Sequence, residues 1–182
     1  EGDDKLMEEF FEKDTLPVED LMLGLRLAFQ ARRIVPVVLS SALHTIGSDA
    51  ILDLLVEVFP NPAARGSVSG FSEPGGKGNP IERKVADSEP LGVFVFKTLS
   101  DPFAGRISYF KVMSGILKSD ATLVNFTRGV SERFQHVQSM QGKAGVETPE
   151  MHAGDIGVVV KLKETVTGDT LCQKKSPVVL EA

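Results

Sequence analysis

The sequence contains a single cysteine, Cys172, among its 182 residues. An internal disulfide is therefore excluded, and one thiol fits a reducing compartment. No apolar run reaches the roughly 18 residues that a membrane-spanning helix requires. The first residues, EGDDKLMEEFFEKD, are acidic and lack the basic start and apolar core of a signal peptide. We therefore expect a soluble, cytoplasmic protein with no membrane partner.

The common signatures of catalytic and metal sites are also missing. The three histidines, at positions 44, 136 and 152, are far apart and match no zinc-ligand spacing. No G-x-S-x-G elbow or His/Cys nucleophile pattern is visible. The run Gly75-Gly76-Lys77-Gly78 is followed by Asn79 instead of Ser or Thr, so it does not fit the phosphate-binding P-loop. Residue chemistry alone predicts no catalytic residue and no metal ligand.

Charge is unevenly spread along the chain. Residues 1–65 carry 12 acidic and 6 basic side chains, residues 66–88 carry three of each, and residues 89–182 carry 10 acidic and 11 basic. Neither half is the strongly basic surface expected of a free-standing nucleic-acid binder. Any contact with a polyanion must therefore be local.

The first third has helical periodicity. It predicts helices over 3–13, after Pro17, and from an N-cap at Ser48 to Pro60. The inner stripes of the last two are expected at Leu21, Met22, Leu25 and Phe29, and at Ile51, Leu52, Leu55 and Val58.

The continuous apolar run Ile34–Leu39 predicts a strand buried on both faces, as in a parallel sheet, although Pro36 disfavours a central strand. A strand, loop and helix in this order indicate the last piece of an α/β domain. Ligands of such domains bind beyond the carboxyl ends of the strands, where Ser40–Leu43 lie, although a plain connecting loop is the alternative.

The remainder is organised around Gly92–Gly115, in which two alternating runs flank the turn-rich segment Ser100–Gly105. In the second run, Ile107, Tyr109 and Lys111 are expected on one face, and Ser108, Phe110 and Val112 on the other. Residues 61–80 lack periodicity and predict a linker or loop. Further short strands, separated by turns, indicate a closed or nearly closed antiparallel β-barrel; they are Ala121–Thr127, Arg133–Met140, Ile156–Leu162, Thr170–Cys172 and Val178–Leu180.

Four segments together resemble the elongation factor G family of translational GTPases: DPFAGR at 101–106, YFKVMSGILK at 109–118, AGDI at 153–156 and TGDTLC at 167–172. The resemblance implies that residues 1–65 are the C-terminal part of a GTPase domain, including the end of its helical insertion. It makes 66–88 a linker and 89–182 the second domain. The implied fold is mainly β with an α/β N-terminal portion. It is a translation-factor-type antiparallel β-barrel, preceded by the last strand and helices of a P-loop GTPase domain.

The resemblance also implies a nucleotide site. Ser40-Ser41-Ala42 resembles the family's last guanine-nucleotide motif, which usually reads Gly-Ser-Ala. Ser40, Ser41, Ala42 and Leu43 are then the cofactor-binding residues, with the Ala42 amide on the guanine base and Ser41 shaping the loop. GTP or GDP with Mg²⁺ is expected in a full-length parent of which this chain is a fragment. The phosphate loop, the Asp-x-x-Gly motif and the Asn-Lys-x-Asp motif are missing here, so we expect no bound nucleotide and no GTP hydrolysis by this chain alone.

The expected partners are the ribosome, through small-subunit ribosomal RNA at the barrel, and guanine nucleotide in the parent. The segment 132–143 looks more like the elongation factor G-like paralogues than the main translocase, and that choice stays open. A ribosome-protection or release-factor-type GTPase is also open. So is a stand-alone RNA- or protein-binding barrel, suggested by exposed cations at Lys97, Arg106, Lys111, Lys118, Arg128 and Arg133. Apolar surface of an incomplete α/β portion predicts oligomerisation or local disorder near residues 1–60.

Overall fold

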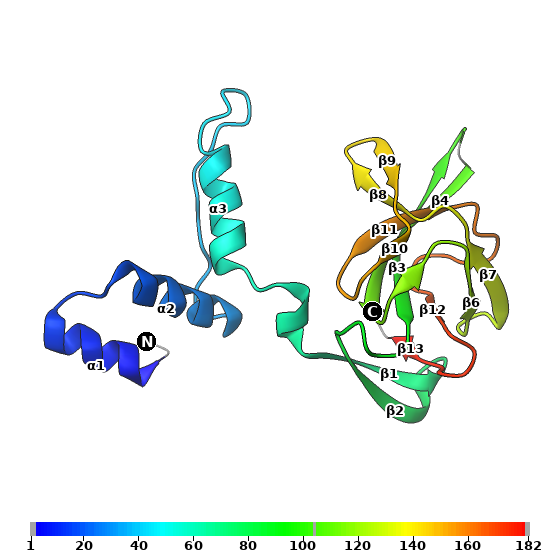
Figure 1. Cartoon of the computed structure of the whole chain (residues 1–182), viewed down its shortest axis with the longest axis horizontal. Helices are drawn as coiled ribbons and strands as arrows, with labels where there is room; N and C mark the ends of the chain where they lie inside the picture. The colour runs from blue at the N-terminus through cyan, green and yellow to red at the C-terminus, as the bar shows by residue number, and fades with distance from the viewer. Residues whose placement is uncertain (1–2, 104, 181–182) are drawn as a thin grey trace. The chain divides into compact units, whose positions relative to one another are not determined.

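A computed structural model describes residues 3–103 and 105–180. The chain divides into two compact units, residues 1–61 and residues 62–182 (Figure 1). Within the described ranges, no helix is both long and apolar enough to cross a membrane.

The first unit contains three helices, α1 (Asp4–Lys13), α2 (Val18–Gln30) and α3 (Ser48–Val58). Asp3 caps α1, because its carboxylate accepts the backbone N–H groups of Lys5 and Leu6 at 3.0 and 3.1 Å. The N-cap of α3 is Gly47, and the expected cap Ser48 is the first helical residue. α2 packs against the end of α3 through Phe29 and Phe59, whose ring centroids lie 4.4 Å apart.

The expected buried strand at 34–39 is not formed. This segment has no ladder partner among the described residues, and Val35, Val37 and Leu39 are 85%, 84% and 93% exposed. A strand buried on both faces needs flanking strands and covering layers, and the first unit supplies neither.

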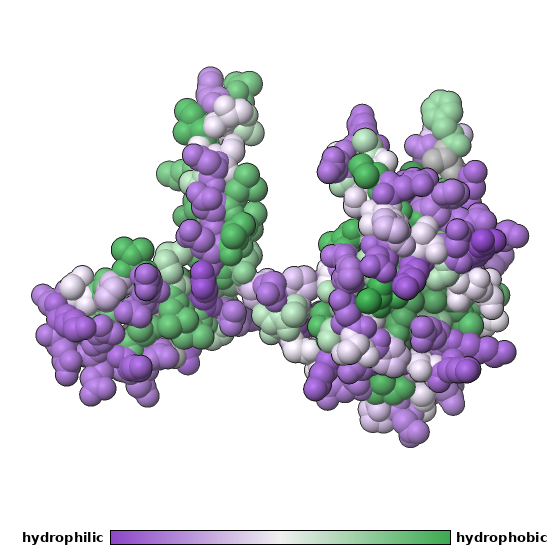
Figure 2. All heavy atoms as spheres, viewed as in Figure 1, coloured by the Kyte–Doolittle hydropathy of each residue, from purple (hydrophilic) through white to green (hydrophobic). Residues whose placement is uncertain are grey.

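The expected inner stripes of α2 and α3 are also incompletely covered. Leu21 is 49% exposed, Leu52 62% and Leu55 45%, whereas Val58 is buried. Figure 2 shows apolar side chains on the surface of α3. The first unit therefore lacks the closed apolar core that the periodicity suggests.

The second unit is the expected antiparallel β-barrel. An eight-stranded sheet runs in the order β7-β6-β12-β3-β4-β11-β8-β9 and is accompanied by the sheets β13-β1-β2 and β10-β5. A 3₁₀ turn at Pro62–Arg65 precedes β1. The strands are β1 (Ser67–Glu73), β2 (Lys77–Lys84), β3 (Gly92–Asp101), β4 (Gly105–Ser114), β5 (Leu117–Lys118), β6 (Ala121–Asn125), β7 (Val130–Phe134), β8 (Gln138–Gln141), β9 (Ala144–Glu147), β10 (Glu150–Met151), β11 (Ile156–Val160), β12 (Thr170–Cys172) and β13 (Val179–Leu180).

The organising hairpin β3–β4 forms as predicted, with a tighter turn. The ladder extends to the pair Asp101–Gly105, and β4 alternates in burial over its length. Ser108, Phe110 and Val112 are buried, whereas the alternate positions are partly exposed. Phe110 contacts Phe134 of β7 edge to face at 5.5 Å, across the barrel interior. The predicted inner and outer faces of the second strand are confirmed.

The segment expected to be a linker at 66–88 is instead mostly a β-hairpin. β1 pairs with β2 over Ser67–Glu73, and its other edge pairs with β13. Val68 and Val85 form an apolar cluster with Cys172 and Leu180, separate from the cluster that contains Phe110 and Phe134. The Gly and Ser residues of this segment hide an alternating apolar pattern. In addition, the hairpin is buried by strands far along the chain, which local sequence does not reveal.

The predicted strand Arg133–Met140 is also wrong as one element. β7 ends at Phe134 and β8 begins at Gln138. Between them His136 has a left-handed φ of 49°, and the Val137 amide donates a hydrogen bond to the Ser119 hydroxyl at 3.4 Å. This break redirects the chain from the β6–β7 side of the barrel to β11.

Candidate functional site

The predicted nucleotide loop is a compact loop before α3. Ser41 and Ile46 exchange two backbone hydrogen bonds, of 3.0 and 3.1 Å, and the Thr45 amide donates to the Ala42 carbonyl at 3.4 Å. Ser40, Ala42 and Leu43 are exposed, and Ser41 is half-buried. The Ala42 N–H has no hydrogen-bond acceptor among the described residues. The loop therefore offers an available donor at the position that the resemblance assigns to the guanine base.

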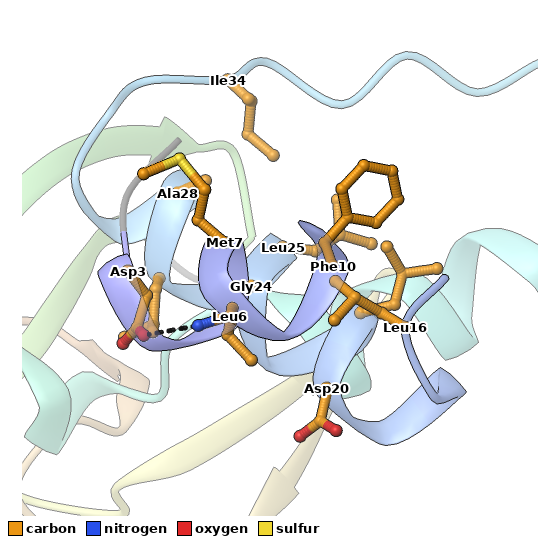
Figure 3. A pocket seen from close by; sticks show the side chains of 12 residues that line it. Asp3, Leu6, Met7, Phe10, Leu16, Asp20, Gly24, Leu25, Ala28 and Ile34 are labelled. Atoms are coloured by element: carbon orange, nitrogen blue, oxygen red, sulfur yellow. Dashed lines mark hydrogen bonds between the residues drawn. The ribbon is translucent and has the colours of Figure 1, made fainter. Parts of the chain in front are cut away.

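A pocket of about 270 Å³ lies between α1 and α2, within the first unit. Its lining is mostly apolar, and Figure 3 shows Leu6, Phe10, Leu16 and Leu25 around it. One of its two carboxylates, Asp3, is already engaged as the helix cap. The pocket therefore offers little polar chemistry for a ligand.

Two of the family-like segments are turns with the same internal construction. In each, an aspartate follows a glycine of positive φ, 105° at Gly154 and 93° at Gly168. Asp155 Oδ2 accepts the backbone N–H three residues earlier at 2.8 Å, and Asp169 Oδ2 does the same at 2.9 Å. Each turn then exchanges two backbone hydrogen bonds with one buried valine, Val112 or Val95. These motifs fasten the barrel's turns to its core strands, so their first role is architectural.

Asp169 also belongs to a buried polar network. Its Oδ2 accepts from Asn125 Nδ2 at 2.9 Å and from Arg128 Nε at 2.6 Å. Nearby, the buried Glu132 carboxylate accepts the N–H groups of residues 163, 164 and 165 at 3.2, 2.8 and 3.1 Å. A carboxylate that accepts several backbone amides fixes a loop that has no regular ladder. The two acids therefore anchor the loop 161–169 through the backbone amides of residues 163–166.

The six cations singled out in the sequence do not form one surface. Arg128 is paired with Asp169, and Arg133 with Asp120 at 3.2 Å. Lys97 and Lys118 are exposed, whereas Lys111 is half-buried. Arg106 is exposed and donates from Nη1 to the Lys163 and Thr165 carbonyls at 2.7 and 3.3 Å.

Two lysines that the sequence reading overlooked lie beside Arg106. The Lys161 amide donates to the Arg106 carbonyl at 2.8 Å, and both Lys161 and Lys163 are exposed. A local cluster of Arg106, Lys161 and Lys163 results. Only the pairing of β4 with β11 brings these residues together, so no sequence spacing could have identified the cluster.

A histidine–carboxylate pair links the connection after β2 to the turn before β11. His152 Nδ1 lies 2.8 Å from Asp87 Oδ2, and the Ala153 amide donates to Asp87 Oδ1 at 2.9 Å. The hydrogen bond and charge of Asp87 raise the pKa of His152. The Ala153 amide, followed by His152, lowers the pKa of Asp87. Among the described residues, no group of three or more His, Cys, Asp or Glu side chains is arranged to hold a metal ion.

Comparison with known proteins identifies the barrel. Residues 90–174 match the model of elongation factor G domain 2. A crystal structure of a protein from Thermus thermophilus aligns with a TM-score of 0.71 and 28% sequence identity, covering 96% of this chain and 23% of that chain. This chain thus spans less than a quarter of the length of the matched protein.

The second unit is therefore a translation-factor β-barrel. Residues 90–174 belong to the elongation factor G domain 2 family, and the structural similarity of the chain agrees with that match.

Proposed function

We propose that this chain is part of an elongation factor G-type GTPase and that its barrel docks the protein on the small ribosomal subunit. The observation that carries the proposal is the match of residues 90–174 to elongation factor G domain 2. The cluster of Arg106, Lys161 and Lys163 adds support, because arginine and lysine side chains commonly contact nucleic-acid phosphates.

The barrel does not need high affinity to serve this role. Its residues 89–182 carry only one more basic than acidic side chain. A docking module within a larger factor gains effective concentration from the other contacts of that factor, so a small local cation cluster suffices. A stand-alone RNA-binding barrel would need a broader basic surface.

Co-sedimentation with purified small ribosomal subunits tests the docking proposal. We expect the whole chain to bind at low salt and to lose affinity steeply as salt rises. Lys161→Ala and Lys163→Ala should each lower the salt slope by about one. Lys77→Ala is the matched control, because Lys77 is an exposed lysine on β2 outside the cluster. Absent or salt-insensitive binding would overturn the proposal.

We also propose that the Ser40–Leu43 loop contacts the guanine base in a protein that carries the complete nucleotide domain. The available Ala42 N–H supports this role, because it can donate to the base without breaking a bond within the loop. In such a protein, Ala42→Pro removes the donor and should weaken GDP binding by about tenfold, the loss of one hydrogen bond. Ala42→Gly retains the N–H and should bind GDP normally. Equal affinities for the two variants would contradict this role.

A further inference from the structure

The tip of the β3–β4 hairpin displays an aromatic ring that contributes nothing to the barrel core. Phe103 is 96% exposed, the largest exposed fraction among the described large apolar side chains. Its amide donates to Asp101 Oδ1 at 2.9 Å, and the ladder is paired as far as Asp101 and Gly105. The preceding Pro102 has a fixed φ. The ring therefore lies next to strand ends that are paired as far as Asp101 and Gly105.

The cation cluster lies beside the base of this tip. Arg106 belongs to the same hairpin, and Lys161 and Lys163 are attached to it through the backbone bonds described above. Of the nearby acids, Asp101 is half-buried and accepts the Phe103 amide, and Glu164 is exposed. The buried carboxylates of Glu132 and Asp169 are satisfied by amides and by Arg128. Exposed positive charge therefore outnumbers exposed negative charge at the base of the tip.

The backbone that carries two of these cations is also anchored. The loop that carries Lys161 and Lys163 is held by the Glu132 carboxylate, which accepts three consecutive backbone amides. A second hairpin, β8–β9, projects from the same end of the barrel in Figure 1, and its turn carries the exposed Lys143. Figure 2 shows an apolar end on the β3–β4 hairpin above a hydrophilic surface. The backbone of the loop that carries Lys161 and Lys163 therefore needs little further ordering when a ligand binds at this end of the barrel.

We propose that Phe103 stacks on an unpaired base of small-subunit ribosomal RNA, while Arg106, Lys161 and Lys163 contact the flanking phosphates. The inference rests on the proposed docking function and assigns the contact to one side chain. A benzyl side chain has no hydrogen-bonding group, so it suits the π-face of a splayed base without sequence preference. Neighbouring cations neutralise the phosphates that such a base brings with it.

Four variants of the whole chain test the stacking contact in small-subunit binding. Phe103→Ala should weaken binding about 5- to 150-fold, the range typical of one base–aromatic stack. Phe103→Tyr retains the ring and should bind like the parent chain. Phe103→Leu retains an apolar side chain without a ring and should bind nearly as weakly as Phe103→Ala. Phe11→Ala is the matched control, because Phe11 is a 76% exposed phenylalanine in the first unit.

Tethered hydroxyl-radical cleavage supplies an independent readout. An iron chelate attached to Phe103→Cys should cut small-subunit RNA close to the tip. The parent chain treated with the same reagent should cut nothing, because its Cys172 is buried and burial raises the pKa of that thiol.

The outcomes separate this inference from the docking proposal. If the parent chain fails to bind small subunits at low salt, both are overturned. If the parent chain binds but Phe103→Ala binds equally well and the tethered probe leaves RNA intact, docking stands and the tip contact is wrong. If Phe103→Leu binds as tightly as the parent, the ring enters an apolar pocket of a protein, and base stacking is wrong.

Discussion

Asp155 and Asp169 make the same hydrogen bond in two different turns, and only one of them is buried. Each Oδ2 accepts the backbone N–H three residues earlier, at 2.8 and 2.9 Å. Asp155 is exposed, whereas Asp169 is 2% exposed and is additionally bonded to Asn125 and Arg128. The same Gly-Asp pattern thus supports a surface turn in one place and an internal network in the other.

The two aspartates should therefore differ in their effect on stability. Asp155→Ala loses one exposed hydrogen bond and should lower the free energy of unfolding by about 1 kcal/mol. Asp169→Ala removes one acceptor shared by the buried Asn125 amide, the Val166 N–H and the Arg128 guanidinium, although Asn125 keeps its bond to Thr165 and Arg128 is 42% exposed. The loss should be about 3 kcal/mol. Urea unfolding of both variants measures the difference. Equal losses would show that the buried network contributes nothing beyond the turn.

The pair His152–Asp87 predicts a pH-dependent contribution to stability. Because the pKa of His152 is raised above its ordinary 6.5, its contribution is complete below that value and is lost as pH rises through the raised pKa. Because the pKa of Asp87 is lowered below its ordinary 3.8, its contribution is complete above that value and is lost as pH falls through the lowered pKa. The pair His152–Asp87 therefore stabilises the fold most between pH 3.8 and pH 6.5, the ordinary pKa values of the two groups.

The groups that face His152 are Asp87, Glu150, whose Oε1 lies 3.9 Å from Nε2, and Asp155. His152→Ala should destabilise the chain more at about pH 5 than at about pH 8 in urea unfolding. His136→Ala is the control, because its exposed ring pairs with Glu147 in the β8–β9 region and not with Asp87. A pH-independent loss for His152→Ala would contradict the pair's role.

Arg83 lies in the segment that the sequence predicts to be a linker, yet its substitution should clearly lower the stability of the barrel. Its side chain is buried, and it donates to the carbonyls of Pro90 and Ser176 at 2.9 and 2.6 Å. Burial lowers the pKa of its guanidinium. Arg83→Met fills a similar volume but leaves these carbonyls without their donor. We therefore expect the free energy of unfolding to fall by about 2 kcal/mol.

Hydrogen exchange checks the location of the Arg83 effect. Arg83 joins β2 to the connection before β3 and to the segment before β13. In Arg83→Met, amides of β1 and β2 should therefore lose protection more than those of β3 and β4. Uniform loss over the whole barrel, or no loss, would contradict a local fastening role.

The exposed run at 34–39 predicts self-association of the chain. Val35, Val37 and Leu39 each expose more than four-fifths of their surface. Contiguous apolar surface of this kind promotes association. Sedimentation velocity should therefore detect dimers or larger species, and the triple change of these residues to Lys should shift them toward monomer. Gln141→Lys, at an exposed polar site on β8, should not. A monomeric parent chain with protected amides at 34–39 would contradict this prediction.

The sequence predicted local elements better than their environment. Helices at 3–13 and after Pro17, and the alternation of Ser108, Phe110 and Val112, follow from short-range periodicity and are confirmed. The hairpin at 67–84 escaped prediction because its burial is supplied by β13, about a hundred residues later. The buried strand expected at 34–39 was wrong because burial requires neighbouring strands, and apolar composition alone does not supply them.

The candidate site follows the same division. Ser40–Leu43 and Arg106 were singled out as candidates in the sequence, and the role of Ser40–Leu43 stays a prediction, whereas Lys161 and Lys163 were not singled out. Residues 106 and 161 are opposed only through the register of β4 with β11, which single-sequence patterns do not encode. The Gly-Asp motifs were recognised, but their function as anchors on Val112 and Val95 required the three-dimensional contacts.

Competition for the small ribosomal subunit tests the central claim most directly. If the barrel docks as an elongation factor G domain 2, the unlabelled chain should displace a fluorescently labelled, authentic elongation factor G from purified small subunits in a concentration-dependent way. Phe11→Ala should displace it equally well, and a chain with Arg106, Lys161 and Lys163 all changed to Ala should displace it poorly. Undiminished binding of the labelled factor at saturating concentrations of the chain would contradict the account.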